Sequence, residues 1–206
     1  MREIIASDDI RLRQTVRLLR EEEFDTTYVQ DLAKNVLRIA AEGTTERPAS
    51  VGLAAIQLGE LVSFVAVDLQ ADRLRTGSAV APEYLGLANL QVTPLGEKMF
   101  TDVEGCHSVG RLAGLVPRFR RVHVTGYRLD GTIFEDEVEG YGGYLARVFQ
   151  HEADHNEGRT FVSRVANNND LFWVPGSDFK RFRADPQAWP PADPATVLRY
   201  RSYTRL

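Results

Sequence analysis

The chain has 206 residues, 43% of them hydrophobic, and a formal net charge of -4 at pH 7. This length allows one domain with a single core. The negative charge argues against a nucleic acid as the main ligand, because proteins that bind nucleic acids usually carry a basic stripe. No apolar run approaches the roughly 20 residues of a membrane span, and the N-terminus is too polar for a signal peptide. We therefore expect a cytoplasmic protein with no membrane partner.

The first part of the chain is predicted to be helical. Residues 9–20 and 28–41 both carry apolar side chains at helical spacing. In the second segment Val29 and Leu32 begin a stripe of apolar residues on one side. We expect two helices before the polar break at residues 43–50.

The pattern after this break is typical of strands. Alternating or β-branched runs occupy three segments: 61–70, 88–95 and 122–140. Asp130 and Gly131 form a strong signal for a hairpin turn, with Val122 to Leu129 and Thr132 to Val138 as its arms. Glycines that follow residue 139 end the predicted sheet region.

A further helix is predicted from Tyr144 to Asn156. This stretch has no helix breaker, and Gly158 follows it at a C-cap position. Residues four apart lie on one face of a helix, so the rings of His151 and His155 can reach one metal ion. Glu152, beside the first histidine, adds a carboxylate that can carry a proton. The helix therefore favours a hydrolytic metalloenzyme.

A third ligand must come from elsewhere in the chain. No histidine follows His155, which excludes the arrangement with a third downstream histidine. Downstream acids such as Glu157, Asp170 and Asp178 could serve, but none has an obvious reason to face the pair. Upstream, the only soft donor is Cys106, the single cysteine. One cysteine and two histidines form a tetrahedral site with one position open for water, as catalytic zinc sites require.

Three stretches of this chain resemble the motifs of peptide deformylases, in order and in spacing. They are VGLAAIQLG (51–59), EGCHS (104–108) and QHEADH (150–155). The resemblance covers roughly residues 9–165. It implies an α+β fold, in which antiparallel strands surround a central helix that carries the HExxH motif. We expect a catalytic domain over residues 1–165 and a mostly irregular C-terminal extension over 166–206, packed on the same domain.

The same resemblance implies a set of catalytic roles. The implied metal ligands are Cys106, His151 and His155. Glu152 would then move the proton during attack on the formyl carbon and departure of the amine. Gln57 and the backbone N–H of His107 would stabilise the oxyanion.

Substrate binding is implied for six residues: Val51, Gly52, Gly105, Tyr144, Arg147 and Val148. Val51 and Gly52 fall where the family pairs the substrate backbone as an added strand. Tyr144 and Arg147 fall where the family forms its pocket for the methionine side chain. A guanidinium in an apolar pocket must be paired or reach out to solvent. The pocket is therefore either narrowed and open, or prefers a polar or acidic group.

Other departures from the family pattern also bear on the substrate. Ser50 stands where the family usually has glycine, and His107 stands where it usually has leucine. Ala113 replaces an arginine that many members use to bind the peptide. Ser50 is a modest change at the rim, and His107 adds a titratable ring near the cleft.

The function implied is that of a metal-dependent hydrolase, which removes the N-formyl group from N-formylmethionyl peptides and releases formate. One alternative is a specialised relative that acts on another N-formyl or N-acyl compound. Another is an inactive paralogue that binds a metal or a peptide end, which the presence of both Glu152 and Gln57 disfavours. A thermolysin-like endopeptidase is disfavoured because the downstream ligand is absent.

The cofactor expected is one divalent metal ion per chain. Affinity favours zinc or nickel over ferrous iron, whereas the resemblance implies Fe(II). We expect Fe(II) in cells and Zn(II) or Ni(II) in material prepared in air. The expected partners are an N-formylated peptide or nascent chain and, transiently, the ribosome, without direct specificity for nucleic acid.

Overall fold

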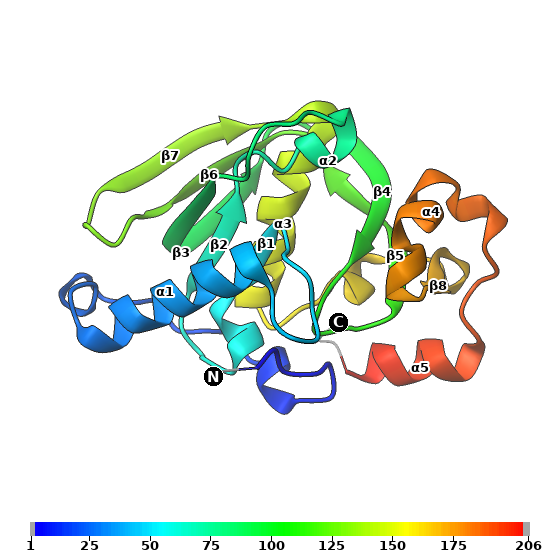
Figure 1. The fold of residues 1–206 in the computed structure, drawn as a ribbon, viewed down its shortest axis with the longest axis horizontal. Helices are drawn as coiled ribbons and strands as arrows, with labels where there is room; N and C mark the ends of the chain where they lie inside the picture. Colours follow the sequence, from blue (N-terminus) through cyan, green and yellow to red (C-terminus); the bar gives the residue numbers. More distant parts are fainter. Residues whose placement is uncertain (1–2, 204–206) are drawn as a thin grey trace.

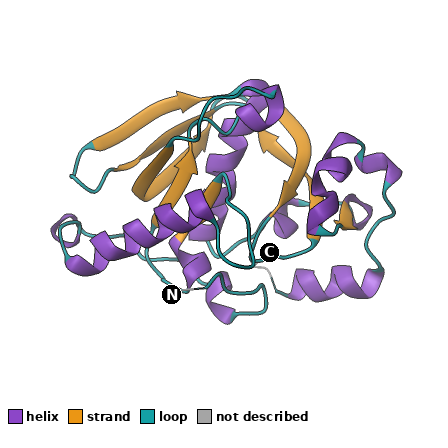
Figure 2. Ribbon diagram, in the orientation of Figure 1, coloured by secondary structure: helices purple, strands orange, loops and turns teal. Residues whose placement is uncertain are grey.

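The computed structural model describes residues 3–203, which form two antiparallel sheets and a central helix (Figures 1 and 2). The first sheet has five strands in the order β1-β2-β3-β6-β7, and the second has three in the order β4-β5-β8. The strands are β1 (Gly52–Ala54), β2 (Phe64–Asp68), β3 (Tyr84–Pro94), β4 (Met99–Gly105), β5 (Leu112–Phe119), β6 (Val122–Tyr127), β7 (Ile133–Val138) and β8 (Leu171–Trp173). This α+β arrangement confirms the expected fold class.

The central helix is α3 (Tyr144–Asn156), which has the predicted bounds. Figure 1 shows it between the five-stranded sheet and the strands β4 and β5. Ala146 and Phe149 are fully buried on it, within the core that the large sheet forms. Gly158 follows the helix with a φ of +72°, and a β-carbon there would collide with the backbone of Arg13. The glycine therefore permits the turn that ends the helix.

The helix α1 (Thr27–Glu42) confirms the prediction for residues 28–41. Thr26 caps its N-terminus by accepting a hydrogen bond from the backbone N–H of Val29 at 3.4 Å. Val29, Leu32 and Val36 form its buried stripe, which packs against the five-stranded sheet. The predicted hairpin is also confirmed, since β6 and β7 pair around Gly131, whose φ is +81°.

The prediction of a helix over residues 9–20 is wrong. Within this segment only Ile10–Arg13 form a short 3-10 turn, and residues 14–20 form no helix. The backbone of Arg17 bridges to the segment before β2, donating to the carbonyl of Leu61 at 3.0 Å and accepting from the N–H of Ser63 at 2.8 Å. Leu12 and Leu19 are buried, so their spacing reflected contact with the core and not a helix. Tertiary hydrogen bonds have replaced helical ones here.

Two strands that position the site, β4 and β5, were not among the predicted strands. β5 contains Pro117, which has no N–H for a ladder and so weakens the strand signal. In the structure β5 pairs with β8 only from Leu112 to Gly114, so Pro117 lies where that edge is unpaired. The strand tolerates the proline for this reason.

The prediction of a mostly irregular C-terminal extension is wrong in part. The extension contains β8, the helices α4 (Phe179–Ala184) and α5 (Pro194–Ser202), and short 3-10 turns. Phe182 of α4 is fully buried against Phe172 and Trp189. The assignment of this extension to the same domain as residues 1–165 stays a prediction. Across residues 3–203, no helix combines the length and the apolar character that crossing a membrane demands.

Candidate metal centre

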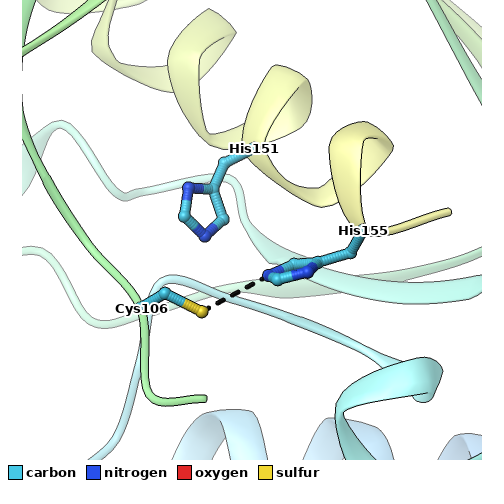
Figure 3. A group of neighbouring side chains, drawn as sticks. All are labelled: Cys106, His151 and His155. Carbon is cyan, nitrogen blue, oxygen red and sulfur yellow. Dashed lines mark hydrogen bonds between the residues drawn. The ribbon is translucent and has the colours of Figure 1, made fainter. Parts of the chain in front are cut away.

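Two histidines of α3 face the cysteine that follows β4. His151 and His155 lie four residues apart, and their ring centroids are 5.1 Å apart. Cys106 comes directly after the last residue of β4, and its Sγ lies 3.4 Å from Nε2 of His155 (Figure 3). One donor atom from each of the three residues lies within 4.8 Å of the others. The structure thus brings together the three residues that the sequence marked as ligands.

The surroundings of Cys106 favour its thiolate form, which can bind a metal cation. Burial alone would raise the pKa of the Cys106 thiol, but the neighbouring rings of His155 and His151 outweigh it and hold this pKa well below its usual value. The thiolate is the form that binds metals. One thiolate and two imidazoles are also the donor types that a divalent transition metal such as zinc or iron prefers. The residues present therefore fit a single metal ion.

A buried network holds the ring of His151 in place. Its Nδ1 lies 2.9 Å from the Glu104 carboxylate, which leaves Nε2 for the metal side. Arg118 donates two hydrogen bonds of 2.9 Å to that carboxylate, and Arg147 donates a third at 2.7 Å. Burial raises the pKa of Glu104, but the charge of Arg118 outweighs it and keeps this pKa well below the usual value. Glu104 is therefore an anion that orients His151.

Glu104 and Arg118 were not among the site residues predicted from the sequence. The spacing offered one signal, because side chains two apart on a strand share a face, and Glu104 stands two residues before Cys106. Nothing local indicated Arg118, which reaches Glu104 from the neighbouring strand β5. It also donates to Asp154 of α3 at 2.5 Å.

Gln57 points its amide nitrogen at the cysteine. Its Oε1 accepts a hydrogen bond of 2.9 Å from the backbone N–H of Ala54, so its Nε2 faces the site. Nε2 lies 3.4 Å from Sγ of Cys106 and 3.3 Å from Oγ of Ser108. An N–H donor held in this way is ready to receive negative charge that develops nearby. His107 follows Cys106 and lines the same cleft.

Glu152 carries an unusual carboxylate. It is 3% exposed, and its Oε2 has no hydrogen-bond partner among the residues that the structure describes. Burial raises the pKa of this group to about 7. Gly52 lies against it so closely that any β-carbon at residue 52 would overlap the carboxylate. A buried carboxyl group with a pKa near neutrality can both accept and donate a proton.

These residues open into a cleft of about 610 Å³. The residues predicted to bind the substrate all line it: Val51, Gly52, Gly105, Tyr144, Arg147 and Val148. Arg147 is only 2% exposed, and its buried guanidinium is paired with Glu104 and donates to the backbone carbonyls of Val116 and Phe100 at 2.7 and 2.6 Å. Of the two options for a guanidinium here, the structure shows the paired one.

Comparison with known proteins identifies the family. The family model for polypeptide deformylase matches residues 1–170. The chain belongs to the polypeptide deformylase family. Peptide deformylase 1 of Xanthomonas campestris pv. campestris is 38% identical over 124 residues, which are 60% of this chain and 70% of that protein. The peptide deformylase of Thermomicrobium roseum is 33% identical over 187 residues, covering 86% of this chain and 93% of that protein.

Solved deformylases share the fold. The crystal structure of peptide deformylase from Thermotoga maritima matches with a TM-score of 0.65 and 27% identity, covering 81% of this chain and 99% of that one. The family match ends at residue 170, one residue before β8 begins. The part of the chain that matches the family therefore contains the candidate metal centre. The segment from β8 onward lies beyond this family match.

Proposed function

We propose that this protein hydrolyses the formyl amide at the start of N-formylmethionyl peptides, giving formate and a free amine. One observation supports this most strongly: Cys106, His151 and His155 converge within 4.8 Å beside the buried carboxylate of Glu152. Membership of the polypeptide deformylase family agrees with it. We also propose that the protein acts in the cytoplasm on nascent chains, with transient contact to the ribosome.

Cys106, His151 and His155 would hold one divalent ion, Fe(II) in cells and Zn(II) or Ni(II) in preparations made in air. When bound, such an ion supplies Lewis-acid stabilisation of negative charge and makes water a stronger acid. The other groups of the site then bind the peptide, orient its formyl group and move protons.

Glu152 transfers the proton in the proposed reaction. Its carboxylate takes a proton from the attacking water and delivers it to the nitrogen of the departing amine, so that one water and one amide give formate and an amine. Nε2 of Gln57 and the backbone N–H of His107 donate to the oxygen that becomes negative during the attack. Val51 and Gly52 offer the backbone of an edge strand, along which the peptide can pair.

Formate release tests this function. The anaerobically purified protein loaded with Fe(II) is given formyl-Met-Ala-Ser, with acetyl-Met-Ala-Ser as the matched amide. We expect formate from the first peptide, little or no acetate from the second, and no release by Cys106→Ala, which loses a metal ligand. If the metal-loaded protein released no formate although its metal content was one ion per chain, the proposed function would be wrong.

A further inference from the structure

The C-terminal extension forms one wall of the cleft. Val174 continues β8 and donates from its backbone N–H to the carbonyl of Arg111 at 2.8 Å, which fixes the extension to the start of β5. Figure 1 shows α4 and β8 beside β5. Phe179 of α4 packs on Gly105, since a β-carbon at that glycine would lie 2.9 Å from its ring. Phe179 and Arg183 both line the cleft. Residues beyond the family match thus reach the edge of the candidate metal centre.

Arg183 lies over two aromatic rings that line the cleft, Phe179 of the extension and Tyr144 of α3. Its guanidinium carbon is 5.2 Å from the ring centre of Phe179 and 6.0 Å from that of Tyr144. Tyr144 stands seven residues before His151 on α3, a rise of about 10 Å along the helix. A substrate side chain that starts at the formyl amide and runs along α3 toward Tyr144 would therefore end near Arg183.

The other arginines near Tyr144 have carboxylate partners. Arg75, whose guanidinium lies 4.6 Å from the Tyr144 ring centre, pairs with Asp102, and Arg147 pairs with Glu104. Arg183 forms no ion pair within residues 3–203, and its Nε is buried without a hydrogen-bond partner. Burial and the charge of Arg183 lower the pKa of Arg75, which reflects this crowding of positive charge.

We propose that Arg183 is a specificity-determining residue, which binds the carboxylate of an acidic side chain on the first residue of the formylated substrate. This inference rests on the proposed deformylase function and extends it: besides formylmethionyl peptides, the same site would accept peptides whose formylated first residue is acidic. The methylene groups of such a side chain would pack against Phe179, Tyr144 and Val148. Its carboxylate would supply the partner that Arg183 lacks, at a position that is half-buried and so only partly screened.

Matched peptides separate charge from shape. Formyl-Glu-Ala-Ser and formyl-Gln-Ala-Ser are nearly isosteric, so the ratio of their kcat/KM values reports the charge. Arg183→Met removes the guanidinium from the cleft. Arg181→Met is the matched control, because Arg181 lies on the same helix but stacks on Trp189 at 5.5 Å in a separate hollow. Arg183→Lys keeps the charge with less stacking.

We expect the wild-type protein to favour the Glu peptide over the Gln peptide by on the order of 10-fold to 100-fold. Arg183→Met should bring this ratio close to one, Arg183→Lys should keep part of it, and Arg181→Met should leave it unchanged. A wild-type ratio near or below one, or a ratio that Arg183→Met does not alter, would overturn the inference while formate release still upheld the deformylase function. Release from none of the Met, Gln and Glu peptides would instead refute that function, and the inference with it.

The wild-type ratio does not depend on how well any variant folds. A purely structural Arg183 would change the melting temperature of Arg183→Met without changing the ratio.

Discussion

Arg147 and His151 contact the same carboxylate: Glu104 receives the Arg147 guanidinium at 2.7 Å and lies 2.9 Å from Nδ1 of His151. One turn of α3 separates the two residues. An arginine at the position of an expected apolar pocket is thus part of the support of a candidate metal ligand. Changes in this network should therefore affect both the stability of the fold and the affinity for the metal.

Replacing Arg147 should destabilise the fold. Arg147→Met removes three hydrogen bonds and leaves the carbonyls of Val116 and Phe100 buried without this donor. We expect the free energy of unfolding to fall by about 3 kcal/mol, measured by urea denaturation. Arg38→Met removes an exposed pair with Glu42 at 3.8 Å and should change it by less than about 0.5 kcal/mol. Equal effects of the two variants would refute a structural role for Arg147.

Loss of the Glu104 carboxylate should weaken metal binding. Glu104→Gln removes the negative charge that orients the His151 ring, and we expect about 10-fold to 100-fold lower metal affinity, measured by competition with a chelator. Glu135→Gln is the matched control, because Glu135 makes a 2.9 Å contact with His123 on the surface. If both variants kept the wild-type affinity, the orienting role of Glu104 would be excluded.

Gly52 is expected to tolerate no side chain. Gly52→Ala would place a methyl group on the Glu152 carboxylate. Because this carboxylate ends a flexible side chain, the fold should persist while the proton carrier moves, and kcat/KM should fall by about 100-fold. Gly176→Ala, where an added methyl group meets no atom within 4 Å, serves as control. Full activity of Gly52→Ala would show that the position of Glu152 is not critical.

The extension over residues 166–206 is predicted to unfold together with the rest of the chain. Phe182→Ala removes a fully buried ring from α4 and should lower the free energy of unfolding by about 3–5 kcal/mol. Phe100→Ala, at a ring that is 47% exposed, should have a small effect. A separate low-temperature transition in calorimetry, with the main transition unchanged, would show instead that the extension is an independent unit.

Elements with a strong local pattern could be predicted from the sequence. The breaker-free run from Tyr144 to Asn156 and the turn at Asp130-Gly131 carry their structure in neighbouring residues. Residues 9–20 could not be predicted correctly, because their apolar spacing comes from contact with distant parts of the chain. Local periodicity cannot distinguish this from an amphipathic helix.

Some residues of the candidate site could likewise be predicted from the sequence, and others could not. The histidine pair and Cys106 stand out by residue type and spacing, and the structure brings their donor atoms together. Arg118 is supplied by another strand, and Arg183 by a segment outside the resembling residues, so no local motif indicated either one. The paired state of Arg147 likewise depends on backbone carbonyls of β4 and β5.

We propose above all that Glu152 carries the proton at a metal site formed by Cys106, His151 and His155. The most direct test is the turnover of formyl-Met-Ala-Ser by Glu152→Gln, with the metal content of the same sample measured in parallel. We predict one metal ion per chain, as in the wild-type protein, and a kcat lower by about 100-fold to 10,000-fold. A variant that retained its metal and a kcat close to the wild-type value would contradict the account.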